Sequence, residues 1–138
     1  MRVMLDTNIV LDLLLDREPF SSDAVKIFSL IESGKLDAFV CATTITTIYY
    51  LVSKSVQKSK TDMIIEDLLQ LFEIAAVDKD VLTSSLKNSG KDFEDSVIYT
   101  SARFSKVDVI VTRDKKGFSN SQVLILKPKE FLASYLSF

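Results

Sequence analysis

The chain has 138 residues, a formal net charge of −2 and a hydrophobic content of 47%, values typical of one soluble globular domain. It contains no histidine and a single cysteine, which excludes histidine acid–base catalysis, histidine-bound zinc and an intrachain disulfide. The near-neutral charge gives the whole molecule no general attraction for nucleic acid or for an anionic membrane. A polyanionic partner would therefore need a local basic patch or a bound cation.

The first predicted element is a short buried strand over the apolar residues 3–5, which ends at Asp6. Thr7 and Asn8 follow it, and residues of these types end strands and begin helices. Residues 9–15 are mostly apolar and continue as a helix. A carboxylate at the carboxyl end of a strand lies where open α/β sheets bind ligands. We therefore expect Asp6 to be a metal ligand, with acids from later in the chain converging on it.

Helices and strands alternate along the rest of the chain. Residues 43–52 are ambiguous, because their β-branched side chains favour a strand while Ile45, Ile48 and Val52 share one helical face; we predict a helix. The other helices are expected at 21–33, from Thr61 to about 72, 78–86, 93–104 and 129–136. The other strands are expected at 36–41, 74–77, 107–111 and 122–126, with a loop at 88–90. This alternation predicts one domain over residues 1–138, an α/β sandwich with a parallel sheet covered on both faces.

Three carboxylates lie where such a fold would gather them. Asp6 ends the first strand, Asp95 is in the first turn of the helix that Asp92 caps, and Asp114 follows the strand at 107–111. Magnesium and manganese prefer oxygen ligands, and a site of two or three carboxylates leaves positions for water and a substrate phosphate. A metal bound there can activate water and neutralise charge on phosphorus.

Each acid also has a purely structural interpretation. Asp6 could cap the first helix, Asp95 could answer the helix dipole, and Asp114 could be a turn residue. Asp92 is better explained as a cap than as a ligand, and Glu94 as a solvated acid. The hypothesis of a metal site depends on the joint placement of the three aspartates.

Four segments resemble motifs of the PIN-domain family, whose members include the toxins of many bacterial toxin–antitoxin pairs. Residues 3–12 resemble its opening motif and residues 92–98 its central acidic motif. Residues 109–118 resemble its late motif, and residues 123–132 its closing strand and helix. The resemblance covers nearly the whole chain in order, and it implies a three-layer α/β/α sandwich with a mainly parallel sheet.

The resemblance implies a ribonuclease directed at single strands, with Mg2+ or Mn2+ held by Asp6, Asp95 and Asp114. Thr7 and Asn8 would position Asp6 or bind water, and Thr112 would support the late acid. Such an enzyme would hydrolyse a phosphodiester to leave a 5′-phosphate and a 3′-hydroxyl. The resemblance also implies a small antitoxin protein as a partner and a homodimer.

The chain departs from the family pattern at two positions. The family usually has a glutamate on the helix at 43–51, where this chain has Thr47, and no acid occurs between Asp37 and Asp62. The late motif often has a further aspartate where this chain has Gly117. An alternative is therefore a catalytically silent PIN-like module that binds RNA or protein. A haloacid dehalogenase-type phosphatase is disfavoured, because it needs an acid where Asn8 stands.

RNA would need basic residues beside the acidic site, since lysine and arginine contacts to phosphate supply affinity without sequence choice. The candidates beside Asp114 are Arg113, Lys115 and Lys116, with Arg113 preferred. Tyr49 and Tyr50 could stack on bases or pack within the fold. Further candidates are Lys54, Lys58, Lys60 and Lys91. The sequence has no apolar run of membrane-spanning length and no recognisable signal peptide, so we expect a cytoplasmic protein.

Overall fold

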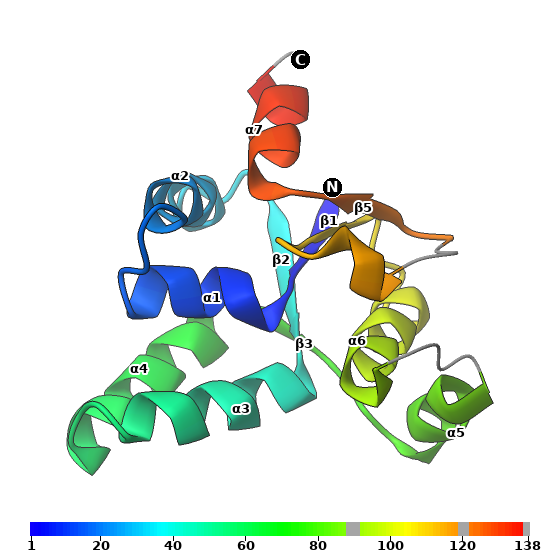
Figure 1. Ribbon diagram of the computed structural model, residues 1–138, viewed down its shortest axis with the longest axis horizontal. Helices are drawn as coiled ribbons and strands as arrows, with labels where there is room; N and C mark the ends of the chain where they lie inside the picture. Colours follow the sequence, from blue (N-terminus) through cyan, green and yellow to red (C-terminus); the bar gives the residue numbers. More distant parts are fainter. Residues whose placement is uncertain (88–91, 119–121, 137–138) are drawn as a thin grey trace.

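The computed structural model describes residues 1–87, 92–118 and 122–136 (Figure 1). Five parallel strands form its sheet, in the order β3-β2-β1-β4-β5. They are β1 (Arg2–Leu5), β2 (Asp37–Cys41), β3 (Glu73–Ala75), β4 (Val109–Val111) and β5 (Leu124–Leu126). The first strand of the chain is thus the central strand of the sheet, and Asp6 follows it at the middle of one edge.

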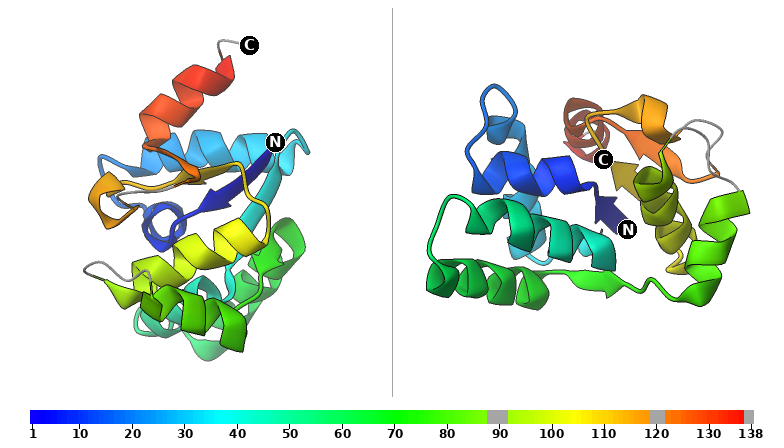
Figure 2. Two further views of the ribbon diagram at one scale, coloured as in Figure 1. Left: turned by 90° about the vertical axis from the view of Figure 1, so that its right-hand side faces the viewer. Right: turned by 60° about the horizontal axis from the view of Figure 1, so that its bottom comes forward.

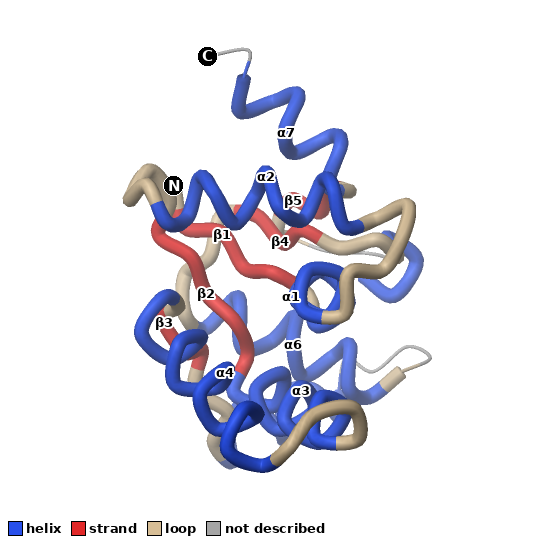
Figure 3. The backbone as a smooth tube through the Cα atoms, turned by 90° about the vertical axis from the view of Figure 1, so that its left-hand side faces the viewer, coloured by secondary structure: helices blue, strands red, loops and turns tan. Residues whose placement is uncertain are grey.

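Helices cover both faces of the sheet (Figures 2 and 3). They are α1 (Thr7–Leu14), α2 (Ser21–Glu32), α3 (Ala42–Ser53), α4 (Lys58–Leu71), α5 (Lys79–Lys87), α6 (Phe93–Phe104) and α7 (Pro128–Leu136), with the short 3-10 helix η1 (Lys115–Phe118). Val3 and Leu5 of β1 pack in one core with residues of α1–α4 and α7. Met4, between them, packs in the opposite core with residues of α5, α6 and η1. The three-layer α/β/α sandwich is confirmed.

The ambiguous segment at 43–52 is helical, as predicted, and lies within α3. Thr44, Ile48 and Val52 are buried along one side of this helix, and α3 packs against α1 and α4. A strand would have sent alternate residues to opposite faces and could not have buried this helical stripe. Tertiary packing therefore overrides the strand preference of the β-branched side chains.

Several predicted boundaries are wrong by a few residues. The helix expected from Thr61 begins at Lys58, and the Thr61 hydroxyl donates to the Gln57 carbonyl, four residues earlier, from inside the helix. The strand expected at 74–77 is β3, and the strand expected at 107–111 begins at Val109. The loop expected at 88–90 lies outside the described residues. Among the described residues, no helix is both long and apolar enough to cross a lipid bilayer.

Candidate metal and catalytic site

Asp6 is held at the carboxyl end of β1 by contacts on both of its carboxylate oxygens. The Thr7 backbone N–H donates to Oδ1 at 2.7 Å, and the Thr112 hydroxyl donates to Oδ2 at 2.6 Å. The Asn8 side-chain amide also donates to Oδ2, at 3.3 Å. Burial raises the pKa of Asp6, and the hydrogen bonds from Thr112 and Thr7 act in the opposite direction. These donors orient the carboxylate and still leave acceptor capacity for a further ligand.

Asp95 lies in the first turn of α6, close enough to Asp6 for the two charges to interact. In Figures 1 and 2 the starts of α1, α3 and α6 all point toward this region. The pKa of Asp95 is raised to about 7, first because burial desolvates its carboxylate and then because of the nearby negative charges, chiefly those of Asp6, Asp92 and Asp114. No described residue donates a hydrogen bond to its carboxylate. Within the part of the chain that the structure describes, Asp95 is thus a partly buried acid without a neutralising partner.

Asp114 is the most exposed of the three predicted ligands. It follows β4, and its backbone N–H donates to the Thr112 hydroxyl at 3.1 Å. The same hydroxyl donates to Asp6, so one side chain connects the two segments that carry these acids. The negative charge of Asp114 raises the pKa of both Asp6 and Asp95. The structure therefore brings the three predicted aspartates to one edge of the sheet.

Asp92 caps α6, as predicted. Its Oδ1 accepts hydrogen bonds from the backbone N–H groups of Glu94 and Asp95, at 2.9 and 3.5 Å. Glu94 is exposed. The cap fixes where α6 begins and therefore places Asp95 in its first turn.

Thr44 also lies beside the site, although the sequence did not single it out. Its hydroxyl is 2.9 Å from the Thr7 hydroxyl, and its side chain is fully buried. Thr47 lies about one helical turn further along α3 and is half-buried. Threonines three residues apart lie on one face of a helix, but nothing in the sequence pattern distinguished the threonine that contacts α1.

Gly117 lies against Asp95 across the site. A Cβ atom built on Gly117 would overlap Asp95 Oδ2 and would lie 3.2 Å from Asp95 Cγ. Any side chain at position 117 would thus compete with the present position of the Asp95 carboxylate. Glycine at position 117, where the resemblance implied an aspartate, therefore leaves room for the Asp95 carboxylate.

The donor set suits a hard divalent cation but is small. Mg2+ is commonly bound by one or two carboxylates, with waters and substrate phosphate completing its coordination. Asp6 and Asp95 supply such oxygens. Among the described residues, Asp95 has no cationic partner and the buried Oδ1 of Asn8 has no hydrogen-bond partner. Within those same residues, no three Asp, Glu, His or Cys side chains are gathered closely enough to hold one ion.

The basic residues beside Asp114 have different environments. Arg113 donates to the buried Asp12 and stacks over the Phe20 ring, 3.9 Å from its centroid. Lys115 pairs with Glu130 at 3.0 Å. Lys116 is exposed and pairs with no acid in the described part of the chain. Contact with RNA remains a prediction for Arg113, Lys115 and Lys116. Of these three, only Lys116 has no ion-pair partner among the described residues.

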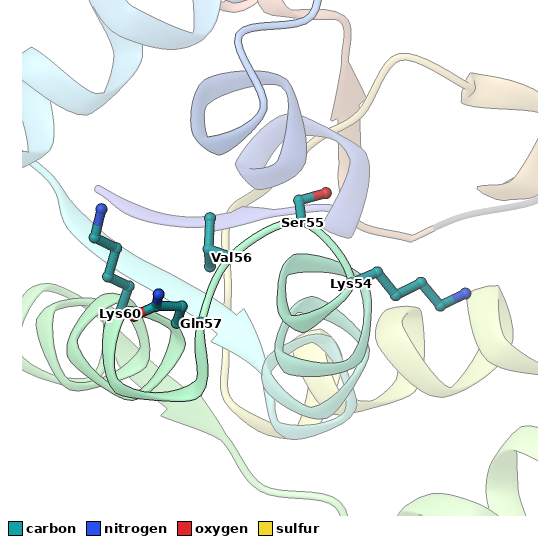
Figure 4. A pocket seen from close by; sticks show the side chains of 5 residues that line it. All are labelled: Lys54, Ser55, Val56, Gln57 and Lys60. Atoms are coloured by element: carbon teal, nitrogen blue, oxygen red, sulfur yellow. The ribbon is translucent and has the colours of Figure 1, made fainter.

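Three other basic candidates, Lys54, Lys58 and Lys60, lie around the turn between α3 and α4, at the opposite end of α3 from Thr44. Lys54 and Lys60 line an open hollow of about 440 Å3 there, together with residues 55–57 (Figure 4). Lys58 forms an ion pair with Asp62 at 2.7 Å, and Asp62 also accepts a hydrogen bond from the Tyr49 hydroxyl. Tyr50 is exposed and lies beneath the Lys54 ammonium. Lys91 lies outside the described residues.

The fold and the acidic edge of its sheet define a class of protein, and comparison with known families agrees. The PIN domain family matches residues 2–116, and the chain belongs to that family.

Among individual proteins, the chain is 27% identical over 135 residues to "Ribonuclease VapC1" of Aquifex aeolicus, covering 94% of this chain and 92% of that protein. The solved "Toxin-antitoxin complex from Klebsiella pneumoniae" has a similar fold, with a TM-score of 0.70 at 20% identity, covering 91% of this chain and 97% of that one. VapBC-1 from nontypeable Haemophilus influenzae also has a TM-score of 0.70, at 16% identity, over 94% and 99% of the two chains.

Proposed function

We propose that this protein is a metal-dependent endoribonuclease that hydrolyses RNA phosphodiesters with Mg2+ or Mn2+. One observation carries the proposal. Asp6 follows the central strand and lies close enough to Asp95 for its negative charge to raise the pKa of Asp95, whose own charge has no neutralising partner among the described residues. Like charges brought together and desolvated are unfavourable unless they serve a ligand, and such sites are candidates for function. The similarity to a protein named a ribonuclease supports RNA as the substrate.

The metal would be held by Asp6 and Asp95. Asp114, the more exposed acid, would become a third ligand only by moving closer to them than it lies in this structure. When bound, it would supply the Lewis acidity that activates water and neutralises charge at phosphorus. Thr7, Asn8 and Thr112 keep the Asp6 carboxylate oriented through their hydrogen bonds. The unpartnered Asn8 Oδ1 can accept a hydrogen bond from a water in the site.

RNA would approach across the β4–η1 segment. Lys116 is the first candidate for a phosphate contact, because it is exposed and has no acidic partner in the described residues. Phosphate contacts of this kind give affinity that falls as salt rises. The products would carry a 5′-phosphate and a 3′-hydroxyl. We place this activity in the cytoplasm, where its proposed substrate is available.

A protein partner is part of the proposal. Structures of similar fold are described as toxin–antitoxin or VapBC complexes, so we propose that this chain is the toxin of such a pair. It would bind a small antitoxin protein and assemble as a homodimer.

The test is cleavage of an end-labelled RNA pool with Mg2+, with Mn2+ and with chelator, for the natural chain and Asp95→Asn. We expect metal-dependent cutting with 5′-phosphate ends that is lost in the variant. Cutting that survives the substitution would refute the role of Asp95. Glu94→Gln is the matched control, since it removes an exposed acid from the same helical turn and should leave cutting intact.

A second function has its own support. Thr47 replaces the glutamate that the resemblance implied, and no three acids are gathered among the described residues. These facts favour a catalytically silent module that binds RNA or protein. In the same experiment, a folded chain that binds the RNA pool but cuts none of it under any condition would select this function.

A further inference from the structure

Asp12 is the most deeply buried acid of the described residues, more so than Asp6 in the site. It lies on α1, its side chain is 1% exposed, and Arg113 binds it with two hydrogen bonds. The Arg113 Nε donates to Oδ2 at 2.7 Å and the terminal nitrogen donates to Oδ1 at 3.2 Å. A bidentate arginine–carboxylate pair fixes both position and orientation, because two parallel bonds define the plane of each group.

Arg17 is a second, weaker partner of Asp12. Its Nε lies 3.0 Å from Asp12 Oδ1, yet that Nε has no partner that satisfies hydrogen-bond geometry within the described residues. The contact is therefore electrostatic rather than directional. Arg17 also donates from its terminal nitrogen to the Asn8 carbonyl at 3.3 Å, which keeps it on α1. Of the residues that the structure describes, Arg113 alone connects the Asp12 side chain to the segment after β4.

That segment is held at consecutive residues. The Thr112 hydroxyl donates to Asp6, and the Arg113 guanidinium binds Asp12. The next residue is Asp114, whose own backbone N–H donates to Thr112. Asp6 caps α1 and Asp12 lies within it, so both attachments are made to one rigid element. The contacts of Thr112 and Arg113 with α1 thus determine where Asp114 lies relative to Asp6.

The surroundings of Arg113 limit its use as a direct RNA contact. Its side chain is 28% exposed, and its guanidinium lies on the Phe20 ring. Leaving Asp12 for a phosphate would strand a buried carboxylate with only the poorly aligned Arg17, and breaking one side of a buried pair is strongly unfavourable.

We propose that Asp12 and Arg113 are positioning residues, which hold Asp114 against Asp6 through the side chain of its sequence neighbour and do not contact RNA. This inference rests on the proposed function for its catalytic consequence, although the ordering of the segment can be measured without activity. Partners that orient metal ligands affect metal affinity or activity by about 10–100-fold when they are mutated.

The test uses three variants, Arg113→Lys, Asp12→Asn and the double variant that combines them. Each is compared with Arg17→Lys. Lysine keeps the charge of Arg113 but cannot make the bidentate contact. Arg17→Lys is the matched control, because it alters the other arginine beside Asp12 without touching the segment after β4. Four measurements are made: hydrogen exchange of the peptide covering 112–118, Mn2+ affinity by calorimetry, RNA affinity by anisotropy in chelator, and kcat and KM for cleavage. Circular dichroism establishes that each variant is folded, and Arg113→Lys serves alone if Asp12→Asn does not fold.

We expect faster exchange at 112–118 in Arg113→Lys and Asp12→Asn but not in Arg17→Lys. In these two test variants the Mn2+ affinity and kcat should fall about 10–100-fold, while KM and the RNA affinity should stay nearly unchanged. The double variant should be no worse than the more affected single variant, because both break one contact. A direct RNA contact predicts the opposite for Asp12→Asn, since the released arginine would tighten RNA binding, and that result would overturn the proposal.

The two proposals fail separately. If the natural chain cuts no RNA, the proposed function fails, and the exchange and Mn2+ measurements still decide the role of the pair. If the chain cuts RNA but Arg113→Lys exchanges at 112–118 like the natural chain, the positioning role fails and the nuclease stands.

Discussion

Replacing Asp95 by asparagine should stabilise the folded protein at alkaline pH while it abolishes RNA cleavage. The folded-state pKa of Asp95 is raised from 3.8 to about 7, so between about pH 4 and 7 the folded chain holds a proton that the unfolded chain has lost. Stability should accordingly fall as pH rises through that window. Asparagine cannot ionise, so the variant should lack this contribution to the pH dependence.

The magnitude follows from the same shift. A change from 3.8 to about 7 corresponds at full strength to about 4 kcal/mol of lost stability above pH 7. Solvent reaches part of the Asp95 side chain and screens its charge, so we expect on the order of 1–2 kcal/mol. For a chain of this length, that is a rise in Tm of roughly 3–8 °C for Asp95→Asn at pH 8.

The assay is thermal unfolding in chelator at pH 5.5 and pH 8 for the natural chain, Asp95→Asn and the control Glu94→Gln. The control should retain most of the pH dependence, since Glu94 is exposed and is the last of the charges that act on Asp95. Adding Mn2+ at pH 8 should stabilise the natural chain, by about 2.7 kcal/mol at a hundred times its Kd, and should stabilise Asp95→Asn less. The reasoning is refuted if Asp95→Asn is less stable than the natural chain at pH 8, or if its Tm falls with pH to the same extent.

Three further substitutions test individual contacts. Gly117→Ala should displace the Asp95 carboxylate and reduce RNA cleavage by about tenfold or more. Its Tm should change little, because the atom that the new methyl group meets is the end of a side chain, and equal cleavage would show that the contact has no consequence. Thr112→Val removes the 2.6 Å hydrogen bond to Asp6 and should lower the free energy of unfolding by about 1.5–3 kcal/mol. Thr112→Ser keeps the hydroxyl and should retain most of that free energy, and urea unfolding measures both variants. Thr47→Glu should tighten Mn2+ binding measured by calorimetry, and an unchanged affinity would mean that Thr47 does not face the site.

The acidic site was predictable from sequence because its residues are tied to the ends of elements. Asp6 ends a short apolar run and Asp95 follows a cap at Asp92, and both signals are local. Carboxyl ends of parallel strands meet at one edge, so the order of strands and helices was enough to place Asp6 and Asp114 together. The element boundaries were predicted less accurately. A threonine such as Thr61 is a suitable residue to cap the start of a helix, but in the structure it lies inside α4.

Contacts between residues distant in sequence were not predictable in the same way. Arg113 was preferred as an RNA contact because it adjoins a predicted ligand, but its guanidinium is engaged by Asp12, 101 positions away. Thr44 could not be separated from the other threonines of its helix until α3 was placed against α1. The close approach of Gly117 to Asp95 likewise joins two segments that no local pattern relates.

By itself, the sequence determined the alternation of strands and helices, the burial of β1 on both faces and the three aspartates at strand and helix ends. These follow from periodicity, capping and residue chemistry, which act over a few residues. Only the tertiary structure decided which charges are paired and which are left without a partner. It pairs Arg113 with Asp12 and leaves Asp95 unpaired among the described residues. Charges act through space at distances of a few ångströms, and only the folded chain sets those distances.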